Sequence, residues 1–413
     1  MKIVMHCVYF PPEVGGLESH VYYLCRGLVQ RGCQVSVVTS RSRPGLASHE
    51  ILDGIAVWRT WLPARNSVGW IVHAGGSTAK LAMAAQDADI IHAQAFQSVL
   101  PGFVVKRATG APLVSTWHTS HFLKRADSPF WRPIFRRLLE WSDHNLAASV
   151  EIADVARGIA PETPVEPLAN GVETDIFKRT APLLPATDRL RIVLPRRLFE
   201  KNGVDFFVRA MPLIVEQANV EAVVVGDGPE REELEALTGS LGMSERIQFL
   251  GARSHADMPG LLSSADLAVF PSLMEATSVA ALESMACELP VAASDVGGLP
   301  EIVNEDVGAL FEPGNPTALA QAVIGLLARA DLRDMGREAR SRVVEKWSNA
   351  RLVDRHGQHG CCVDFLPVRL PRVVPAAGEE MVQQRLESRC LFVVIGDDPG
   401  YAEGNNRSVI HRM

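Results

Sequence analysis

The chain has 413 residues, of which 47% are hydrophobic and 22% are charged. This composition excludes a disordered or fibrous protein, and at about 150 residues per domain the length predicts two or three domains. Because 48 Asp and Glu residues outnumber 41 Lys and Arg residues, the formal net charge is -7 and no nucleic-acid partner is expected.

The first residues, MKIVMHCVYFPP, form an apolar run that is too short for a secretory signal, and no window of about 18 residues is uninterruptedly apolar. We therefore expect a cytoplasmic protein. The seven cysteines include no CxxC spacing, which disfavours a disulfide framework and a zinc site.

The first half of the chain alternates strand and helix patterns. The apolar run at 2–10 is typical of a strand covered on both faces, and apolar residues at helical spacing follow at 16–32. This alternation predicts βαβ units around a parallel sheet. Further strands are predicted at 34–40, 88–94, 112–118 and 145–149, with helices at 97–108 and 130–142.

A segment rich in Pro and charge at 173–189 is typical of a linker between domains, and a second alternating series follows it. We therefore expect an α/β protein in which two Rossmann-like domains, 1–172 and 190–350, face each other across a cleft. Ligands of such sheets bind beyond the carboxyl ends of the strands. In the second series, strands are predicted at 190–197, 220–228, 246–251, 266–272 and 290–298, with helices at 203–217, 229–241, 278–287 and 315–330.

The last segment, 351–413, differs from the rest of the chain. It has frequent Pro and Gly and little helical or strand periodicity, which predicts a poorly ordered tail. We expect the residues beyond about 355 to lie outside the functional core.

The strongest functional signal is a pair of glutamates, Glu275 and Glu283, with seven residues between them. The first follows a predicted strand and the second lies on the next helix, so each carboxylate can accept hydrogen bonds from vicinal hydroxyls, of a sugar and of a ribose. The start of that helix, at Thr277, Ser278 and Val279, offers unpaired N–H groups to a diphosphate. The alternative is a solvated helix face, which the small apolar neighbours disfavour.

This segment resembles the E-x7-E signature of glycosyltransferase family 4, a large group of retaining enzymes, and the resemblance covers residues 1 to about 350. It implies the GT-B architecture, with an N-terminal acceptor-binding domain and a C-terminal nucleotide-sugar-binding domain. Many members follow the first glutamate with Gly-Phe-Gly or Pro-Phe-Gly. This chain has Ala276, Thr277 and Ser278 there, so the donor sugar stays open.

A basic motif, LPRRLFEKNG, follows the first predicted strand of the second domain. Arg196, Arg197 and Lys201 can neutralise a leaving diphosphate, the arginines by a fork of donors and the lysine as a point charge. The motif is similar to the family's G-R-L-x-x-E-K-G. The alignment is ambiguous by one residue, so either Arg196 or Arg197 can correspond to the arginine of the family motif. A solvated basic turn is the alternative.

Five more positions are candidate binding or catalytic residues. Gly15 and Gly16, between the first strand and the first helix, let a loop approach a phosphate or sugar closely. The resemblance places His118 facing the donor sugar and the acceptor, and it matches Asn170 to an Asn-Gly-Val segment near the domain junction. Asp227 is expected in the same cleft, or as a helix N-cap. Weaker claims belong to His6, His92 and His121.

The resemblance implies a retaining transferase that moves a hexosyl group from a nucleotide-diphosphate sugar to an unidentified sugar, lipid-linked or small-molecule acceptor. The basic groups imply that no metal or other cofactor is needed. Asp87 and Asp89 spell D-x-D, but they precede a strand and so lie at the wrong end of the sheet. A non-catalytic nucleotide-sugar-binding subunit is the alternative. A nicotinamide-dependent oxidoreductase is disfavoured because the G-x-G-x-x-G fingerprint is missing.

Residues 124–141 mix basic and aromatic side chains. Such a helix can lie on an anionic membrane, which would make the protein peripheral to the inner membrane face. The alternative is an aromatic face buried in the core of the first domain.

Overall fold

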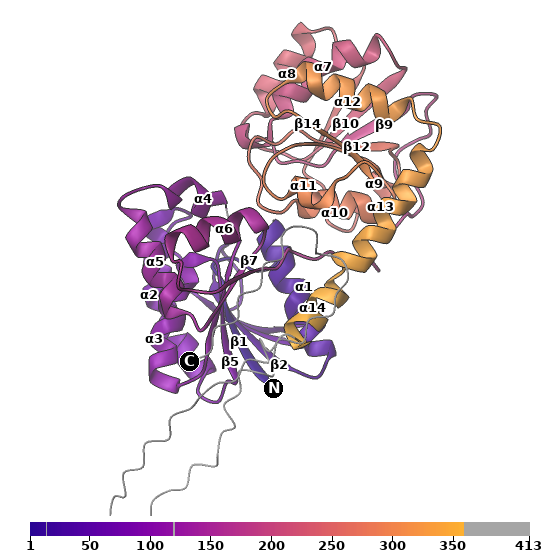
Figure 1. Cartoon of the computed structure of the whole chain (residues 1–413). Coiled ribbons are helices and arrows are strands. Elements are labelled where there is room, and N and C mark those ends of the chain that lie inside the picture. Colours follow the sequence, from indigo (N-terminus) through magenta and orange to yellow (C-terminus); the bar gives the residue numbers. More distant parts are fainter. Residues whose placement is uncertain (14, 119, 359–413) are drawn as a thin grey trace, which may run out of the picture. The chain divides into compact units, whose positions relative to one another are not determined.

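The computed structural model of the chain describes residues 1–13, 15–118 and 120–358, which form two α/β domains. Each domain has one sheet between two layers of helices (Figure 1). The prediction of two Rossmann-like domains is therefore confirmed. The segment 359–413, expected to be a poorly ordered tail, lies outside the described residues.

Eight strands form the sheet of the first domain: β1 (Lys2–His6), β2 (Gln34–Ser40), β3 (His49–Leu52), β4 (Ile55–Thr60), β5 (Ile90–Gln94), β6 (Leu113–Trp117), β7 (His144–Ala147) and β8 (Val165–Pro167). Their order is β3-β4-β2-β1-β5-β6-β7-β8. All neighbouring pairs are parallel except β3 with β4. Strands β5 and β6 are buried along their whole length because helices cover both faces of the sheet.

The hairpin β3–β4 was missed by the sequence analysis. Its strands are joined by Asp53 and Gly54, whose φ angles of 48° and 81° are those of a type I′ turn. The Asp-Gly pair between two short apolar runs was the signal that could have revealed it.

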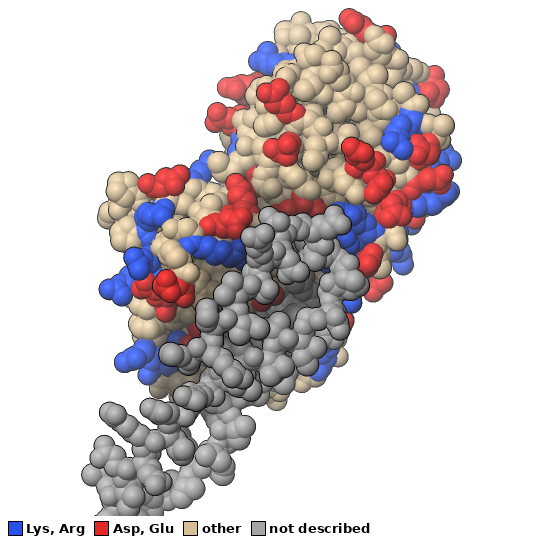
Figure 2. Space-filling view, in the orientation of Figure 1, with Lys and Arg blue, Asp and Glu red and all other residues tan. Residues whose placement is uncertain are grey.

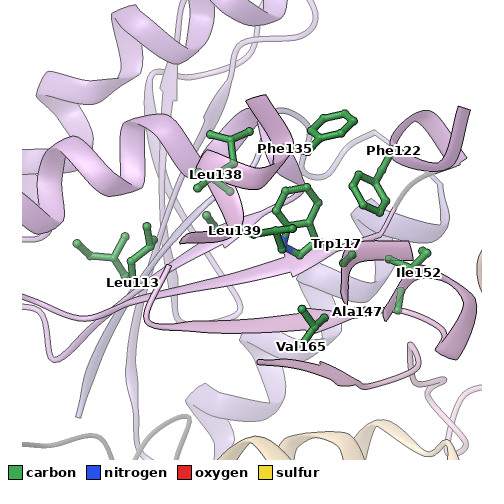
Figure 3. Packing of buried hydrophobic residues seen from close by; sticks show 14 of the residues in the cluster. Leu113, Trp117, Phe122, Phe135, Leu138, Leu139, Ala147, Ile152 and Val165 are labelled. Atoms are coloured by element: carbon green, nitrogen blue, oxygen red, sulfur yellow. The ribbon is translucent and has the colours of Figure 1, made fainter. Parts of the chain in front are cut away.

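Helix α5 buries the apolar face of the segment that was considered for membrane contact. Phe135, Leu138 and Leu139 are buried, and they belong to the same core cluster as Trp117 of β6 (Figure 3). Membrane contact through 124–141 is therefore corrected in favour of burial, since these apolar side chains have partners within the domain. The helices of this domain are α1 (Gly16–Gln30), α2 (Ser67–Ala84), η1 (Phe96–Ser98), α3 (Val99–Thr109), α4 (Ser120–Ala126), α5 (Trp131–Trp141) and α6 (Val150–Ile159).

Six strands form the all-parallel sheet of the second domain: β9 (Leu190–Leu194), β10 (Val220–Val225), β11 (Ile247–Gly251), β12 (Leu267–Phe270), β13 (Val291–Ser294) and β14 (Gly308–Phe311). Their order is β11-β10-β9-β12-β13-β14. Apolar side chains of the strands and helices form one core layer on each face. The helices of this domain are η2 (Glu200–Asn202), α7 (Val204–Val215), α8 (Arg231–Ser240), α9 (Met258–Leu262), α10 (Val279–Ala286), α11 (Leu299–Ile302), α12 (Pro316–Leu327) and α13 (Leu332–Lys346). The last helix, α14 (Asn349–Gln358), packs against the first domain.

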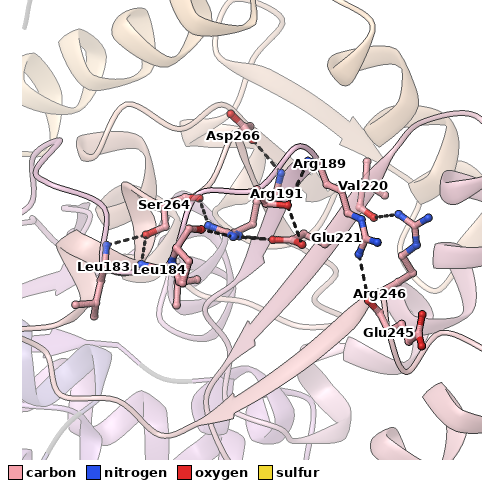
Figure 4. Close-up of polar contacts among 12 residues, drawn as sticks. Leu183, Leu184, Arg189, Arg191, Val220, Glu221, Glu245, Arg246, Ser264 and Asp266 are labelled. Atoms are coloured by element: carbon pink, nitrogen blue, oxygen red, sulfur yellow. Dashed lines mark hydrogen bonds and ion pairs between the residues drawn. The ribbon is translucent and has the colours of Figure 1, made fainter.

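The chain before β9 is tied to the second domain at the amino-terminal edge of its sheet (Figure 4). Ser264 Oγ accepts hydrogen bonds from the backbone N–H groups of Leu183 and Leu184, at 2.9 and 3.0 Å. Arg191 donates to Pro185 O at 2.9 Å and to Glu221 Oε1 at 2.7 Å. The end of the expected linker is therefore anchored rather than loose.

Helix α14 corrects the expectation that the tail begins at residue 351. Leu352 and Val353 are buried in the same apolar cluster as Leu24 of α1. The approach is close, because a Cβ on Gly27 would lie 2.6 Å from Val353 Cγ2. The last helix of the described chain therefore stabilises the first domain.

Cutting the chain on either side of α14 is expected to give opposite results. A chain ending at Gln358 should unfold at the temperature of the full chain. A chain ending at Ser348 should lose about 3–6 kcal/mol of unfolding free energy, since two side chains worth about 1.5–3 kcal/mol each are no longer buried. Thermal unfolding of both truncations would check this, and equal destabilisation by the two cuts would contradict it.

None of the helices in the described ranges is both long enough and apolar enough to cross a membrane. On the face drawn in Figure 2, basic and acidic side chains of the described residues are interspersed.

Candidate active site

A pocket of about 520 Å³ lies at the carboxyl ends of strands from both sheets. Its walls come from the segments after β1, β5 and β6 in the first domain and after β9 and β12 in the second. This is where open parallel sheets bind ligands. Apart from Asp227, the pocket brings together all of the stronger candidates from the sequence: Gly15, Gly16, His118, Asn170, Arg196, Arg197, Lys201, Glu275, Thr277, Ser278, Val279 and Glu283.

Arg196 fixes the position of Glu275. The guanidinium is 8% exposed, and its Nη2 lies 2.6 Å from Glu275 Oε2. The same group donates to Ser272 Oγ at 2.5 Å and to Asn202 Oδ1 at 2.9 Å. Because its donors are directed at these acceptors, Arg196 holds the carboxylate in one orientation within the pocket.

A glycine turn after β13 supports the loop that carries Glu275. Gly297 has φ of 57°, and a Cβ at this position would lie 1.8 Å from Glu275 O. Gly298 N donates to Ala276 O at 3.0 Å. Only a residue without a Cβ permits this approach of two backbones.

Replacing Gly297 by alanine is therefore expected to displace the Glu275 loop and to lower the unfolding free energy by roughly 1–3 kcal/mol. Gly325→Ala in α12 is the matched control, because its Cβ would meet nothing within 4 Å. Chemical denaturation of both variants would check this. Similar stability of the two variants would show that the turn tolerates a side chain.

Lys201 and Arg197 supply positive charge on the same wall of the pocket. The Lys201 carbonyl accepts hydrogen bonds from the N–H groups of Leu273 and Met274, at 2.9 and 3.3 Å, which ties the lysine to the Glu275 loop. Burial lowers the pKa of Lys201, and Arg197 and Arg196 add to this while Glu275 opposes it. Arg197 is exposed, unlike its buried neighbour, and lines the pocket.

Two helix amino-termini meet in the pocket. α1 begins at Gly16 and α10 at Val279, and a Cβ on Gly16 would lie 3.7 Å from Val279 Cγ2. Ser278 caps α10 by accepting from Ala281 N. Helix amino-termini carry partial positive charge, so this part of the pocket favours an anion.

Glu283 is held by a residue that the sequence analysis missed. His255 Nε2 lies 3.0 Å from Glu283 Oε1, and the Tyr23 hydroxyl lies 3.2 Å from His255 Nδ1. Burial raises the pKa of Glu283, against the opposing effect of His255. A lone histidine in a loop gave no signal of this contact in the sequence.

If Glu283 binds the ribose of a nucleotide diphosphate, as the sequence predicts, the affinity for that ligand should fall as the pH is lowered through a value above 4.5, the ordinary pKa of a glutamate. The raised pKa of Glu283 lets it gain a proton at a higher pH than usual, and the protonated carboxyl accepts fewer hydrogen bonds from a ribose. Calorimetric titrations at several pH values would check this. Glu283→Gln should show only the pH dependence of the ligand itself, and identical profiles for the two proteins would contradict the assignment.

The first domain contributes the opposite wall. His118 is 6% exposed, and its Nε2 lies 2.7 Å from Gln94 Oε1. His121 also lines the pocket, although its claim from the sequence was weaker. Trp70 Nε1 donates to the Tyr9 hydroxyl at 3.0 Å. Aromatic, amide and imidazole groups together make this wall suited to a sugar or another polyol.

Glu18 is a second pocket residue that the sequence analysis missed. It lies in the first turn of α1, where an acidic residue is ordinarily a partner of the helix dipole. Burial raises the pKa of Glu18, while the charge of Arg197 opposes this. The Glu18 carboxyl group thus lines the pocket beside the helix start that favours an anion.

Asp227 lies outside the pocket, contrary to expectation. It is exposed, its carboxylate accepts from Gly228 N at 2.9 Å, and its Oδ2 lies 3.6 Å from Arg231 Nη1. The turn after β10 directs the side chain to its own helix, and the residue that precedes α8 as its cap is Glu230. Both expectations for Asp227 are therefore wrong.

The weaker candidates His6 and His92, and the D-x-D residues Asp87 and Asp89, have structural partners. His6 is fully buried against Ser77, and burial lowers its pKa to about 3, so it is neutral. His92 lies 2.7 Å from Thr116 Oγ1. Asp87 and Asp89 both contact Lys2, at the amino-terminal edge of the sheet.

Comparisons with known proteins identify the family. The model described as Glycosyltransferase Family 4 matches residues 14–176, and the model described as Glycosyl transferases group 1 matches residues 176–342. An uncharacterized glycosyltransferase of Methanocaldococcus jannaschii is 30% identical over 84% of this chain and 95% of its own length. The chain belongs to glycosyltransferase family 4. The resemblance read from the E-x7-E segment is thus confirmed, and the protein is a glycosyltransferase.

Several other proteins align with most of this family 4 chain. A phosphatidylinositol N-acetylglucosaminyltransferase subunit from Arabidopsis thaliana is 27% identical over 78% of this chain and 73% of its own. The structure of a sucrose-phosphate synthase from Thermosynechococcus elongatus has a TM-score of 0.78, with 23% identity over 87% of this chain and 98% of that one. HepE of Anabaena, in complex with UDP and glucose, has a TM-score of 0.71, with 20% identity over 87% and 99%. These structures confirm the GT-B fold.

Proposed function

We propose that the protein transfers a hexosyl group, with retention, from a nucleotide-diphosphate sugar to an acceptor held by the first domain. The observation that carries the proposal is the convergence of Glu275, Glu283 and Lys201 in one pocket with two helix amino-termini. Hydroxyl-binding carboxylates beside an anion-binding region match the chemistry of such a donor. HepE, with UDP and glucose bound, is a neighbour in fold and supports a nucleotide-sugar donor.

The donor is proposed to lie on the second domain. Glu283 accepts from the ribose, the start of α10 receives the diphosphate, and Glu275 orients the sugar. Since Arg196 engages the Glu275 carboxylate at 2.6 Å, that carboxylate suits hydrogen bonding better than covalent attack. The leaving diphosphate then takes the proton of the acceptor on the same face of the sugar, which gives retention.

Positive charge for the leaving group is proposed to come from Lys201 and Arg197. Both line the pocket, and Arg197 does so as an exposed side chain while Arg196 is occupied with Glu275. Preorganised cations stabilise charge that develops in a transition state. We therefore propose transfer without a metal ion, and Arg197 as the arginine that faces the diphosphate.

The acceptor is proposed to contact the first domain near His118, Tyr9 and Trp70. The Arabidopsis relative is named for transfer of N-acetylglucosamine to phosphatidylinositol, which supports a lipid-linked acceptor as one class to test.

A panel of nucleotide diphosphates in a thermal-shift assay would test donor binding. One base should raise the unfolding temperature selectively, since a ligand stabilises the native state by mass action. The matching nucleotide sugars should then be hydrolysed slowly or transferred, and NMR should show the anomeric configuration of the donor in the first product. Selective binding without any turnover would favour a non-catalytic subunit.

A further inference from the structure

A continuous apolar surface runs along the outside of α2. Val68, Ile71, Val72 and Met83 are 69%, 68%, 42% and 63% exposed, and their spacing places them on one face of the helix. The remaining exposed positions of this face are Gly75, Gly76 and Ala79. We call the face from Val68 to Met83 the α2 face. None of its exposed side chains is polar, and the half-buried Thr78 at its edge donates its hydroxyl to Ala74 O.

The apolar surface continues beyond the helix. Trp61, just before α2, is 71% exposed, although a large aromatic side chain ordinarily finds cover. Helix α3 packs beside α2 on the same side of the sheet (Figure 1), and it exposes Leu100 and Val104. Exposed apolar side chains gathered on two adjacent helices in this way mark an interaction surface.

Basic side chains surround the start of the α2 face. Arg41, Arg43 and Arg65 are exposed, and Arg41 N donates to Thr60 O beside Trp61. Arg43 and Arg65 both contact Glu13, at 2.8 and 2.7 Å, so the three arginines keep a net charge of about +2 beside one carboxylate.

The segment that carries the α2 face, Trp61 and Arg65 contains no acidic residue of its own. Between Asp53 and Asp87 there is no acidic residue, whereas the chain as a whole carries a net charge of -7. The net charge of this segment is therefore positive, opposite in sign to the net charge of the whole chain.

We propose that the α2 face, with Trp61 and the three arginines, docks on an anionic lipid bilayer. Apolar side chains on one face of a helix enter the boundary between headgroups and acyl chains, and a tryptophan suits that boundary. The arginines meet the negative surface potential of anionic lipid. A second copy of this chain fits less well, because a two-fold contact would bring like charges together.

The docking surface adjoins the pocket. Trp70 lies on α2 and lines the pocket on the side opposite to the α2 face. On the proposed function, this arrangement brings the acceptor wall close to the membrane, where an acceptor with an acyl chain would present its headgroup. The docking itself does not depend on the proposed function.

Sedimentation with vesicles tests the proposal. The full chain should bind vesicles of phosphatidylcholine with 30% phosphatidylglycerol, a composition on the order of natural anionic leaflets. It should bind vesicles of phosphatidylcholine alone at least about tenfold more weakly, and added salt should weaken the anionic binding. Ile71→Asp and Val72→Asp should each lower binding about tenfold or more.

Ile51→Asp is the matched control, since Ile51 is 63% exposed on β3 of the same domain. It should bind vesicles as the unchanged chain does. Nucleotide-diphosphate binding and unfolding temperature should be unchanged in all three variants, which separates loss of docking from loss of fold or of donor binding. Absence of vesicle binding, equal loss in the Ile51 control, or a dimer in sedimentation velocity that Ile71→Asp dissociates would overturn the proposal.

Discussion

Replacing Lys201 by alanine is expected to lower turnover by roughly 100-fold to 1000-fold, the effect of removing one preorganised charge donor. The charge that the lysine meets is greatest in the transition state, so turnover should fall far more than acceptor affinity. Steady-state kinetics at saturating donor would check this. Unchanged turnover would remove Lys201 from the proposed role.

Alanine substitutions of Arg196 and Arg197 should cause different kinds of defect. Arg197→Ala should weaken nucleotide-diphosphate binding and slow turnover while leaving unfolding temperature nearly unchanged, because the side chain is exposed. Arg196→Ala should destabilise the protein, because it leaves Glu275 partly buried without its partner. The opposite pattern would place Arg196 at the diphosphate.

Glu275→Gln is expected to lower turnover by on the order of 100-fold or more, because the sugar is no longer held in line for attack. Glutamine is the appropriate replacement, since its amide oxygen can still accept from Arg196 and the buried guanidinium keeps a partner. Kinetics at saturating donor, with unfolding temperature as the control for folding, would measure this. Full turnover in this variant would contradict the assignment.

The parallel sheets could be predicted because buried strands appear in the sequence as apolar runs. The residues at which the strands end could not be predicted. The run at 2–10 exceeds β1, which ends at His6, since Cys7 and Phe10 remain buried after the chain leaves the sheet. Helix α2 was missed for a physical reason. Its inner face buries His73 and Ser77 while its outer face exposes apolar side chains, so the usual amphipathic pattern is inverted.

The pocket could be predicted largely from strand ends, because residues that follow parallel strands gather at one edge of a sheet. The direction of a side chain within a loop was not predictable. Asp227, for example, contacts Arg231 instead of lining the pocket. Glu18 and His255 were missed because their roles depend on neighbours far along the chain, Arg197 and Glu283. The pairing of Arg196 with Glu275 likewise required the structure.

The most direct test of the account is a calorimetric titration of the nucleotide diphosphate into Glu283→Gln and Glu275→Gln. If Glu283 holds the ribose, the first variant should lose roughly 1.5–3 kcal/mol of binding free energy, the value of a charged hydrogen bond. If Glu275 holds only the sugar, the second variant should bind the nucleotide diphosphate as the unchanged protein does. Equal losses in both variants would contradict the assignment of the ribose to Glu283 and of the sugar to Glu275.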